Sequence, residues 1–129
     1  MAALRRRRRR IKHKKEKKMI AHAHARFVHV SPTKVRQVID LIRGRDVENA
    51  LGILMQMTKG SIPMVKKVLN SAISNAKQKG LTENQLFISK IIADPGPMWK
   101  RYRAAAFGRA SSILRKTTHL TIELDAKIK

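Results

Sequence analysis

Hydrophobic residues recur three or four positions apart in three consecutive stretches of the chain, the spacing that lines one face of an α-helix. The first stretch begins at Ser31, a favourable N-cap, and ends at Gly44, a favourable C-terminal stop. The second follows Asp46, a candidate cap, and the third opens at Pro63. The apolar positions of the three stretches are Val35, Val38, Ile39 and Ile42, then Val47, Ala50, Leu51 and Leu54, then Val65, Val68, Leu69, Ala72, Ile73 and Ala76. The sequence therefore predicts three helices that each bury one face.

Apolar and polar residues alternate in three other stretches, at 21–30, 86–92 and 114–124, and this period of two is typical of half-buried strands. The residues predicted to share a face are Ala21, Ala23, Ala25 and Phe27 in the first strand, Leu86, Ile88 and Ile92 in the second, and Leu114, Thr118, Leu120, Ile122 and Leu124 in the third. Ile91 and Thr117 would lie on the opposite faces of their strands. The last two strands are expected to pair antiparallel, because one segment of chain joins them.

The joining segment, residues 94–113, is twenty residues long, whereas an ordinary hairpin loop has roughly two to five. Continued as two paired arms, it would carry its tip about 30 Å from the body. The predicted fold class is α+β: a three-stranded antiparallel sheet packed with three helices, with a long protruding β-hairpin at about 94–113. We expect one domain over residues 19–129, preceded by a disordered basic tail over residues 1–18.

The positive charge lies mainly outside the predicted core. Thirty Lys and Arg residues against eight Asp and Glu give a formal charge of +22, and eleven of the cations fall within residues 1–18. The consecutive guanidinium groups of 5–10 cannot pack on one another, which predicts disorder until a counter-charge arrives. A cleaved transit peptide is the alternative for this tail, although it lacks serine and amphipathic spacing. Such a charge on a small body calls for a polyanion, and nucleic acid is the expected partner.

The chemistry of the predicted hairpin favours RNA. Its segment 95–116 carries six cations and no acid, and arginine donates paired hydrogen bonds to phosphate oxygens. Trp99 and Tyr102 lie between these cations and are predicted to stack on unpaired bases; the alternative is that both are core aromatics. Segment 94–113 contains neither Asn nor Gln, the side chains that commonly read adenine in a DNA groove. Folded RNA therefore fits the hairpin better than duplex DNA.

No feature of the sequence predicts an enzyme, a cofactor or a small-molecule substrate. The chain has no cysteine, which excludes disulfides and thiolate metal sites. His22 and His24 would share a strand face as a pair of metal ligands, but no third ligand is evident, so we interpret them as surface histidines. Neither a phosphate-binding Walker loop nor a nucleophile elbow is present. No apolar run approaches the roughly 18 to 20 residues that span a membrane, so membrane insertion is not expected.

A family resemblance is carried by three stretches: "VHVSPTKVRQVIDLIRGRDVENALGIL", "VKKVLNSAISNAKQ", and the pattern "GPxxKRxRxxAxGRAxxIxxxTxHxTIxL" read from Gly96 to Leu124. In their order these stretches resemble the L-twenty-two family of large-subunit ribosomal proteins, bacterial or organellar type. The resemblance implies a structural protein that binds several domains of the large-subunit ribosomal RNA, aids assembly and touches neighbouring ribosomal proteins. It implies a place in the ribosome, cytoplasmic or organellar. The hairpin would line the nascent-polypeptide exit tunnel and contact nascent polypeptide transiently.

Residue roles follow from the charge pattern and the resemblance together. The predicted RNA-binding residues are Arg5, Arg6, Arg7, Arg8, Arg9, Arg10, Lys12, Lys14 and Lys15 in the tail, Lys34, Arg36, Lys66 and Lys67 in the body, and Lys100, Arg101, Arg103, Arg109, Arg115 and Lys116 in the hairpin. The resemblance implies a tunnel wall made by Arg101, Tyr102, Arg103, Ala104 and Ala105.

Two other functions stay open at this stage. One is an architectural DNA-binding protein whose ribbon enters the minor groove. The other is a protein of anionic membrane surfaces, although the basic segments show no amphipathic helical pattern.

The charge repulsion along the hairpin leads to a prediction about exchange of its backbone amides. In the free protein, amides of residues 95–110 and 1–18 should exchange quickly with solvent, because an isolated two-stranded ribbon is marginally stable. Binding to ribosomal RNA should slow their exchange, as measured by mass spectrometry. A hairpin equally protected with and without RNA would contradict this expectation.

Overall fold

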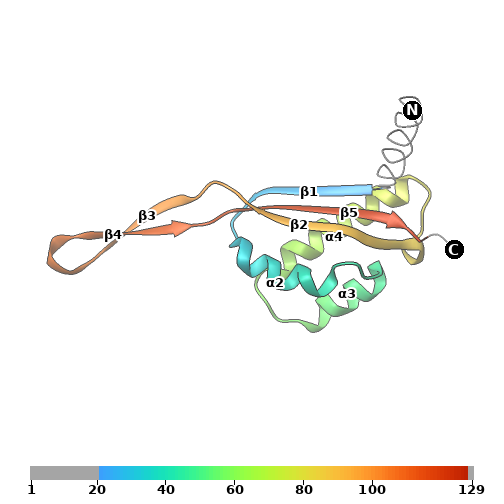
Figure 1. Ribbon diagram of the computed structural model, residues 1–129, viewed down its shortest axis with the longest axis horizontal. Helices are drawn as coiled ribbons and strands as arrows, with labels where there is room; N and C mark the ends of the chain where they lie inside the picture. The colour runs from blue at the N-terminus through green and yellow to red at the C-terminus, as the bar shows by residue number, and fades with distance from the viewer. Residues whose placement is uncertain (1–20, 128–129) are drawn as a thin grey trace, which may run out of the picture.

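The computed structural model describes residues 21–127 (Figure 1). In chain order the elements are β1 Ala21–Val28, α2 Pro32–Ile42, α3 Val47–Gln56, α4 Ile62–Gln78, the 3-10 turn η1 Glu83–Gln85, β2 Leu86–Pro95, β3 Trp99–Ala104, the 3-10 turn η2 Ala106–Gly108, β4 Ala110–Arg115 and β5 Thr118–Ala126. The three predicted helices are present. All of their predicted apolar residues are buried except Leu51, which is half-buried against the core. The tail predicted at 1–18 lies outside the described residues.

The sheet of the body has three antiparallel strands in the order β1-β5-β2, so the last strand of the chain lies in the middle. The helices α2, α3 and α4 lie on the same side of this sheet (Figure 1). From β5, Leu120, Ile122 and Leu124 project into the core and are fully buried. The predicted α+β fold, with a three-stranded antiparallel sheet, three helices and a protruding hairpin, is confirmed.

The predicted helix caps stand at the predicted places but do not make capping bonds. Ser31 Oγ lies 2.9 Å from Thr33 Oγ1 instead of bonding a free amide of α2. Asp46 Oδ2 lies 2.8 Å from Lys127 Nζ instead of capping α3. The helices therefore depend on burial of their apolar faces more than on their ends.

Strict alternation was wrong near the end of β1. The register between β1 and β5 shifts between Ala25 and Val28, and Phe27 takes a φ of +56°. Such a bulge turns the following side chains away from the faces that alternation assigns. Phe27 is consequently exposed and meets the edge of the His119 ring, with 4.9 Å between ring centroids.

A second bulge reverses the predicted faces of β2. The register with β5 shifts between Ile88 and Lys90. The extra residue exchanges the two faces beyond it, so Ile91 is buried and Ile92 is half-buried, the opposite of the prediction.

The alternation that was predicted to run unbroken from Leu114 to Leu124 belongs to two different strands. Leu114 lies in β4, in the hairpin, and is exposed. Thr117, which was predicted to point away, is fully buried, and its hydroxyl is satisfied there by donating to the Pro97 carbonyl oxygen at 2.6 Å.

The hairpin is a ribbon of two strands that pair with each other alone. Its register runs from Trp99 opposite Arg115 to Ala104 opposite Ala110. At the far end Phe107 and Gly108 both take positive φ values, of 58° and 65°, to reverse the chain. The ribbon points away from the sheet and the helices (Figure 1).

Three hydrogen bonds hold the base of the ribbon, which we call the neck. Besides the Thr117–Pro97 bond, the Gly96 amide donates to the Thr117 carbonyl oxygen at 2.9 Å. The buried Thr118 hydroxyl donates to the carbonyl oxygen of Val30, in the turn between β1 and α2, at 2.5 Å. The neck therefore ties the ribbon to the body mainly through two threonine hydroxyl groups that donate to carbonyl oxygens of separate segments.

The tight packing at Gly96 leads to a prediction about stability. A methyl group there would collide with Thr117 Oγ1 and lie 3.1 Å from the His119 ring, so Gly96→Ala should lower the free energy of unfolding by about 1–3 kcal/mol. The control is Gly52→Ala, because Gly52 lies inside α3 with nothing within 4 Å of an added Cβ. That change should stabilise the protein by up to about 1 kcal/mol. Urea unfolding of both variants measures the difference, and equal stabilities would contradict the packing at the neck.

Candidate nucleic-acid interface

The pairing of β3 with β4 sorts the side chains of the hairpin onto two faces. Alternate residues of a strand share a face, and residues directly opposite each other on paired strands share it too. Trp99, Arg101 and Arg103 therefore lie on one face, and Arg115 joins them opposite Trp99. We call these four residues the arginine face. Its three guanidinium groups offer the paired N–H donors that match phosphate oxygens.

The opposite face of the ribbon is less charged. It carries Lys100 and Tyr102 from β3, with Leu114 opposite Lys100. Tyr102 is 71% exposed and Trp99 is 54% exposed, so the alternative that both are core aromatics is wrong. Each ring is open to solvent, as stacking on bases requires, but the two rings face opposite sides of the ribbon.

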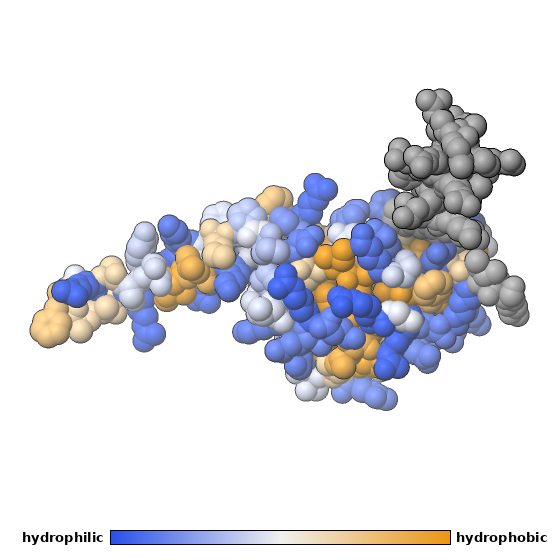
Figure 2. All heavy atoms as spheres, in the orientation of Figure 1, coloured by the Kyte–Doolittle hydropathy of each residue, from blue (hydrophilic) through white to orange (hydrophobic). Residues whose placement is uncertain are grey.

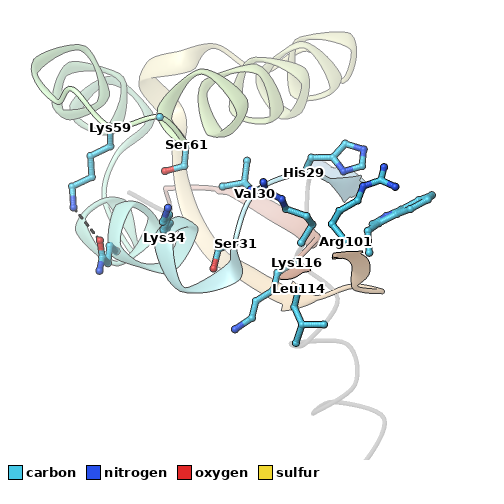
Figure 3. A pocket seen from close by; sticks show the side chains of 13 residues that line it. His29, Val30, Ser31, Lys34, Lys59, Ser61, Arg101, Leu114 and Lys116 are labelled. Carbon is cyan, nitrogen blue, oxygen red and sulfur yellow. Dashed lines mark hydrogen bonds between the residues drawn. The ribbon is translucent and has the colours of Figure 1, made fainter. Parts of the chain in front are cut away.

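A groove of about 960 Å³ opens where the hairpin meets the body. Its walls come from the β1–α2 turn, the N-terminal half of α2, the α3–α4 loop and the base of the ribbon (Figure 3). The lining residues are His29, Val30, Ser31, Lys34, Gln37, Lys59, Gly60, Ser61, Trp99, Arg101, Leu114, Arg115 and Lys116. We call this surface the junction groove. Figure 3 shows Lys34 and Lys59 on the side of the helices, and Arg101 on the side of the ribbon.

The junction groove is strongly positive. Five Lys and Arg side chains line it and no Asp or Glu does. None of these five cations is in an ion pair within residues 21–127. The ion pairs in that part of the chain are Arg43–Asp40, Lys77–Glu83, Lys90–Glu123 and Lys127–Asp46. The carboxylates of these pairs lie outside the groove, and no acidic side chain lines it to compensate its positive charge.

The structure gives Arg36 a contact within the protein. Its Nε and Nη2 donate to the carbonyl oxygen of Ala93, at 3.2 and 3.0 Å, and so join α2 to β2. Lys34, two residues earlier on the same helix, lines the junction groove and has no hydrogen bond or ion pair to a described residue. Of the two body cations that the sequence proposed on α2, Lys34 is the one placed for a ligand.

The other predicted RNA-binding residues do not converge on the groove. Lys66 and Lys67 lie on α4, half-buried and exposed respectively. Lys100 lies on the opposite face of the ribbon, and Arg109 lies at its far end. The residues assigned between 5 and 15 lie outside the described part of the chain. The predicted RNA-binding residues are therefore spread over both faces of the ribbon and over two helices of the body.

Among the groove residues that sequence reasoning missed are two with basic side chains, His29 and Lys59. Lys59 lies in the α3–α4 loop, where Nζ donates to Gln37 Oε1 at 3.1 Å (Figure 3). His29 lies just after β1, with its ring centroid 6.3 Å from that of Trp99. Neither residue belongs to a charged run, so only the folding of distant segments brings them together.

The open face of the sheet shows no metal centre. The rings of His22 and His24 lie 5.1 Å apart, and His24 Nδ1 is hydrogen-bonded to Thr121 Oγ1 at 3.0 Å. Within residues 21–127, no three His, Cys, Asp or Glu side chains come together in a way that would hold an ion. In the same range no helix has the length and apolar character needed to cross a membrane.

Comparison with known proteins gives concordant matches. The sequence model of the family described as "Ribosomal protein L22p/L17e" matches residues 23–125. The protein named large ribosomal subunit protein uL22 of Sulfurihydrogenibium sp. (strain YO3AOP1) is 51% identical over 107 residues, which cover 83% of this chain and 92% of that protein. The protein of the same name from Halothermothrix orenii is 48% identical over 110 residues, covering 84% and 97% of the two chains.

The different contacts of the two α2 cations lead to a prediction. Arg36→Ala should lower the free energy of unfolding by about 1 kcal/mol, because the Ala93 carbonyl loses a charged donor. Lys34→Ala should change it by less than about 0.5 kcal/mol, because its ammonium group makes no contact that holds the fold. Thermal unfolding of both variants at equal ionic strength tests the contrast. A Lys34 variant as unstable as the Arg36 variant would show that the groove cation has a role in folding.

Proposed function

The chain belongs to the ribosomal protein L22p/L17e family, bacterial or organellar type, and from this we propose that it is a structural component of the large ribosomal subunit that binds ribosomal RNA. As a ribosomal protein it is not an enzyme, in agreement with the interpretation of its sequence.

The observation that carries the proposal is the set of unpaired cations in the junction groove and along the ribbon. The eight acids of the chain balance only part of its thirty Lys and Arg residues and leave a net charge of +22. Arginines held on one face of a ribbon, with aromatic rings open to solvent, suit a partner that offers phosphates and unpaired bases. Folded RNA offers both, because sequence-specific contacts to RNA are made mainly at loops, bulges and ends.

The shape of the molecule supports a role in bringing RNA segments together. The ribbon presents the arginine face to one side and Lys100 and Tyr102 to the other, while Lys66 and Lys67 lie on a separate helix. A single RNA helix does not reach all of these surfaces. We therefore infer that several segments of the RNA bind at once, and that the protein aids assembly by holding them in place.

The tip of the ribbon supports the further proposal of a tunnel wall. Residues 104–108 carry no charge and Phe107 is 99% exposed. Figure 2 shows this end as mostly mildly hydrophobic, beyond a stem on which hydrophilic and hydrophobic residues are mixed. The uncharged surface of residues 104–108 would let a nascent chain slide past without holding its charged side chains.

The five residues that the resemblance implies for the tunnel wall are not equivalent in position. Arg101 lines the junction groove beside the body, whereas Ala104 is the last residue of β3 and Ala105 begins the turn. We propose that the contact with nascent polypeptide is made by Ala104 and Ala105, and that Arg101 binds RNA.

Salt dependence of binding tests the proposed function. The affinity for a fragment of large-subunit ribosomal RNA should fall steeply with salt, each neutralised phosphate adding about 0.7–0.9 to the log–log slope. The double variant Arg101→Ala, Arg103→Ala should bind more weakly and reduce the slope by about 1 for each cation removed. The matched control is Lys77→Ala, Lys90→Ala, which removes equal charge from lysines already paired with carboxylates.

Two results would contradict the proposal. One is a salt dependence of RNA affinity that is the same for the Arg101→Ala, Arg103→Ala variant as for the unchanged protein. The other is equal affinity for random duplex DNA at physiological salt, which would favour the architectural DNA-binding alternative. Sedimentation of the tagged protein with large subunits, resistant to moderate salt, is the corresponding expectation in cells.

A further inference from the structure

We propose that the junction groove holds an unpaired RNA nucleotide, whose base stacks on Trp99 while neighbouring phosphates contact lysines of the body. This inference rests on the proposed function and adds to it a defined site.

The indole of Trp99 is placed to receive a base. It is 54% exposed, although tryptophan is a large apolar side chain that normally gains by burial. The nearest aromatic ring, that of His29, is tilted by 56° with 6.3 Å between centroids, so it does not lie flat on the indole. Part of the indole surface therefore stays uncovered, and a nucleobase stacked on it would remove that surface from water.

Lysines that could bind phosphates line the groove on the side of the body. Lys34 comes from α2 and Lys59 from the α3–α4 loop, and both line the same groove as Trp99. The Gln37 amide holds Lys59 Nζ at 3.1 Å, a neutral contact that leaves its charge uncompensated. Lys116 adds a third ammonium group from the neck, and no carboxylate lines the groove. An RNA backbone that enters here would meet cations on both sides of the stacked base.

The size of the groove favours a single unpaired nucleotide. Its volume of about 960 Å³ lies in the range of roughly 300–1,000 Å³ typical of small-molecule sites. A duplex keeps the faces of its bases inside the stack, so it has no free face for Trp99. The bound RNA must therefore be a bulge, a loop or a single-stranded junction in which a base is extruded.

Such a nucleotide would fix the direction of the ribbon relative to the body. Trp99, Arg101 and Arg115 belong to the ribbon, whereas Lys34 and Lys59 belong to the body. The base would contact the ribbon and its phosphates would contact the body. These contacts would add to the hydrogen bonds of the neck in holding the ribbon in place.

The experiment uses the fluorescence of Trp99, which is the only tryptophan of the chain. The full-length protein is titrated with three RNAs of equal length: a single-stranded oligoadenylate, a strand of abasic ribose phosphates, and a duplex. Binding is measured independently by anisotropy of a label on the RNA. Oligoadenylate should quench the tryptophan emission, because the base stacks on the indole. The abasic strand and the duplex should bind through their phosphates with little quenching.

Variants separate the base contact from the phosphate contacts. Trp99→Ala should weaken oligoadenylate binding by about 5- to 150-fold and leave the affinity for the abasic strand nearly unchanged. Trp99→Phe should restore part of the lost affinity, and Met55→Ala, an exposed apolar residue of α3, is the control. The double variant Lys34→Ala, Lys59→Ala should weaken binding of both single strands. The charge-matched double variant at Lys77 and Lys90 should weaken it much less.

The outcomes distinguish this site from the proposed function. Equal quenching by oligoadenylate and the abasic strand would show that the groove binds phosphate without a base, and would overturn the inference. Quenching by the duplex equal to that by the single strand would overturn it as well. Salt-dependent RNA binding with no response of Trp99 would leave the proposed function standing and remove the nucleotide site. No binding of any RNA would contradict both.

Discussion

The structure depends on the burial of one face of a three-stranded sheet beneath three helices. Strand β5 lies between β1 and β2, and its buried residues Leu120, Ile122 and Leu124 face the apolar sides of the helices. This core fixes where β2 and β5 leave the body, and the ribbon is the continuation of those two strands. The ribbon itself has no core. Every residue from 97 to 116 is exposed or half-buried, so its direction is set by the neck and by whatever binds it.

The charges of the body and the ribbon also differ in whether they are paired. Within the described residues, the carboxylates that form ion pairs do so with cations of the body that lie away from the junction groove. The five cations of the groove have no such partner, and the ribbon between residues 96 and 116 has no acid at all. Repulsion among these cations disfavours the free ribbon, and phosphates would relieve it. The buried core thus lies in the body, while the proposed surface for RNA is built mainly from exposed residues.

Strand faces were predicted well only where the strands are regular. Alternation was right for Ala21 and Ala23 and along β5. It was wrong for Phe27, which lies within the irregularity of β1, and for Ile91, which follows the bulge of β2. A bulge adds one residue to one strand opposite a partner that has none to match it. Its position depends on both strands, so the periodicity of a single strand does not reveal it. The buried hydroxyl of Thr117 was missed for a similar reason, since its acceptor at Pro97 lies twenty residues away.

The sequence by itself determined the three helices, the fold class and the long ribbon, because helical spacing and alternation are properties of short segments. Its charge predicted the kind of partner that is proposed above. It also identified the arginines and aromatic rings that the ribbon exposes. Only the tertiary structure decided which cations share a surface. Lys34, Lys59 and Trp99 are far apart along the chain and come together in one groove, whereas Arg36, two residues from Lys34, is engaged with the Ala93 carbonyl. The physical reason is that a site is defined by distances in space, and these are set by how the helices pack on the sheet and by the bonds of the neck.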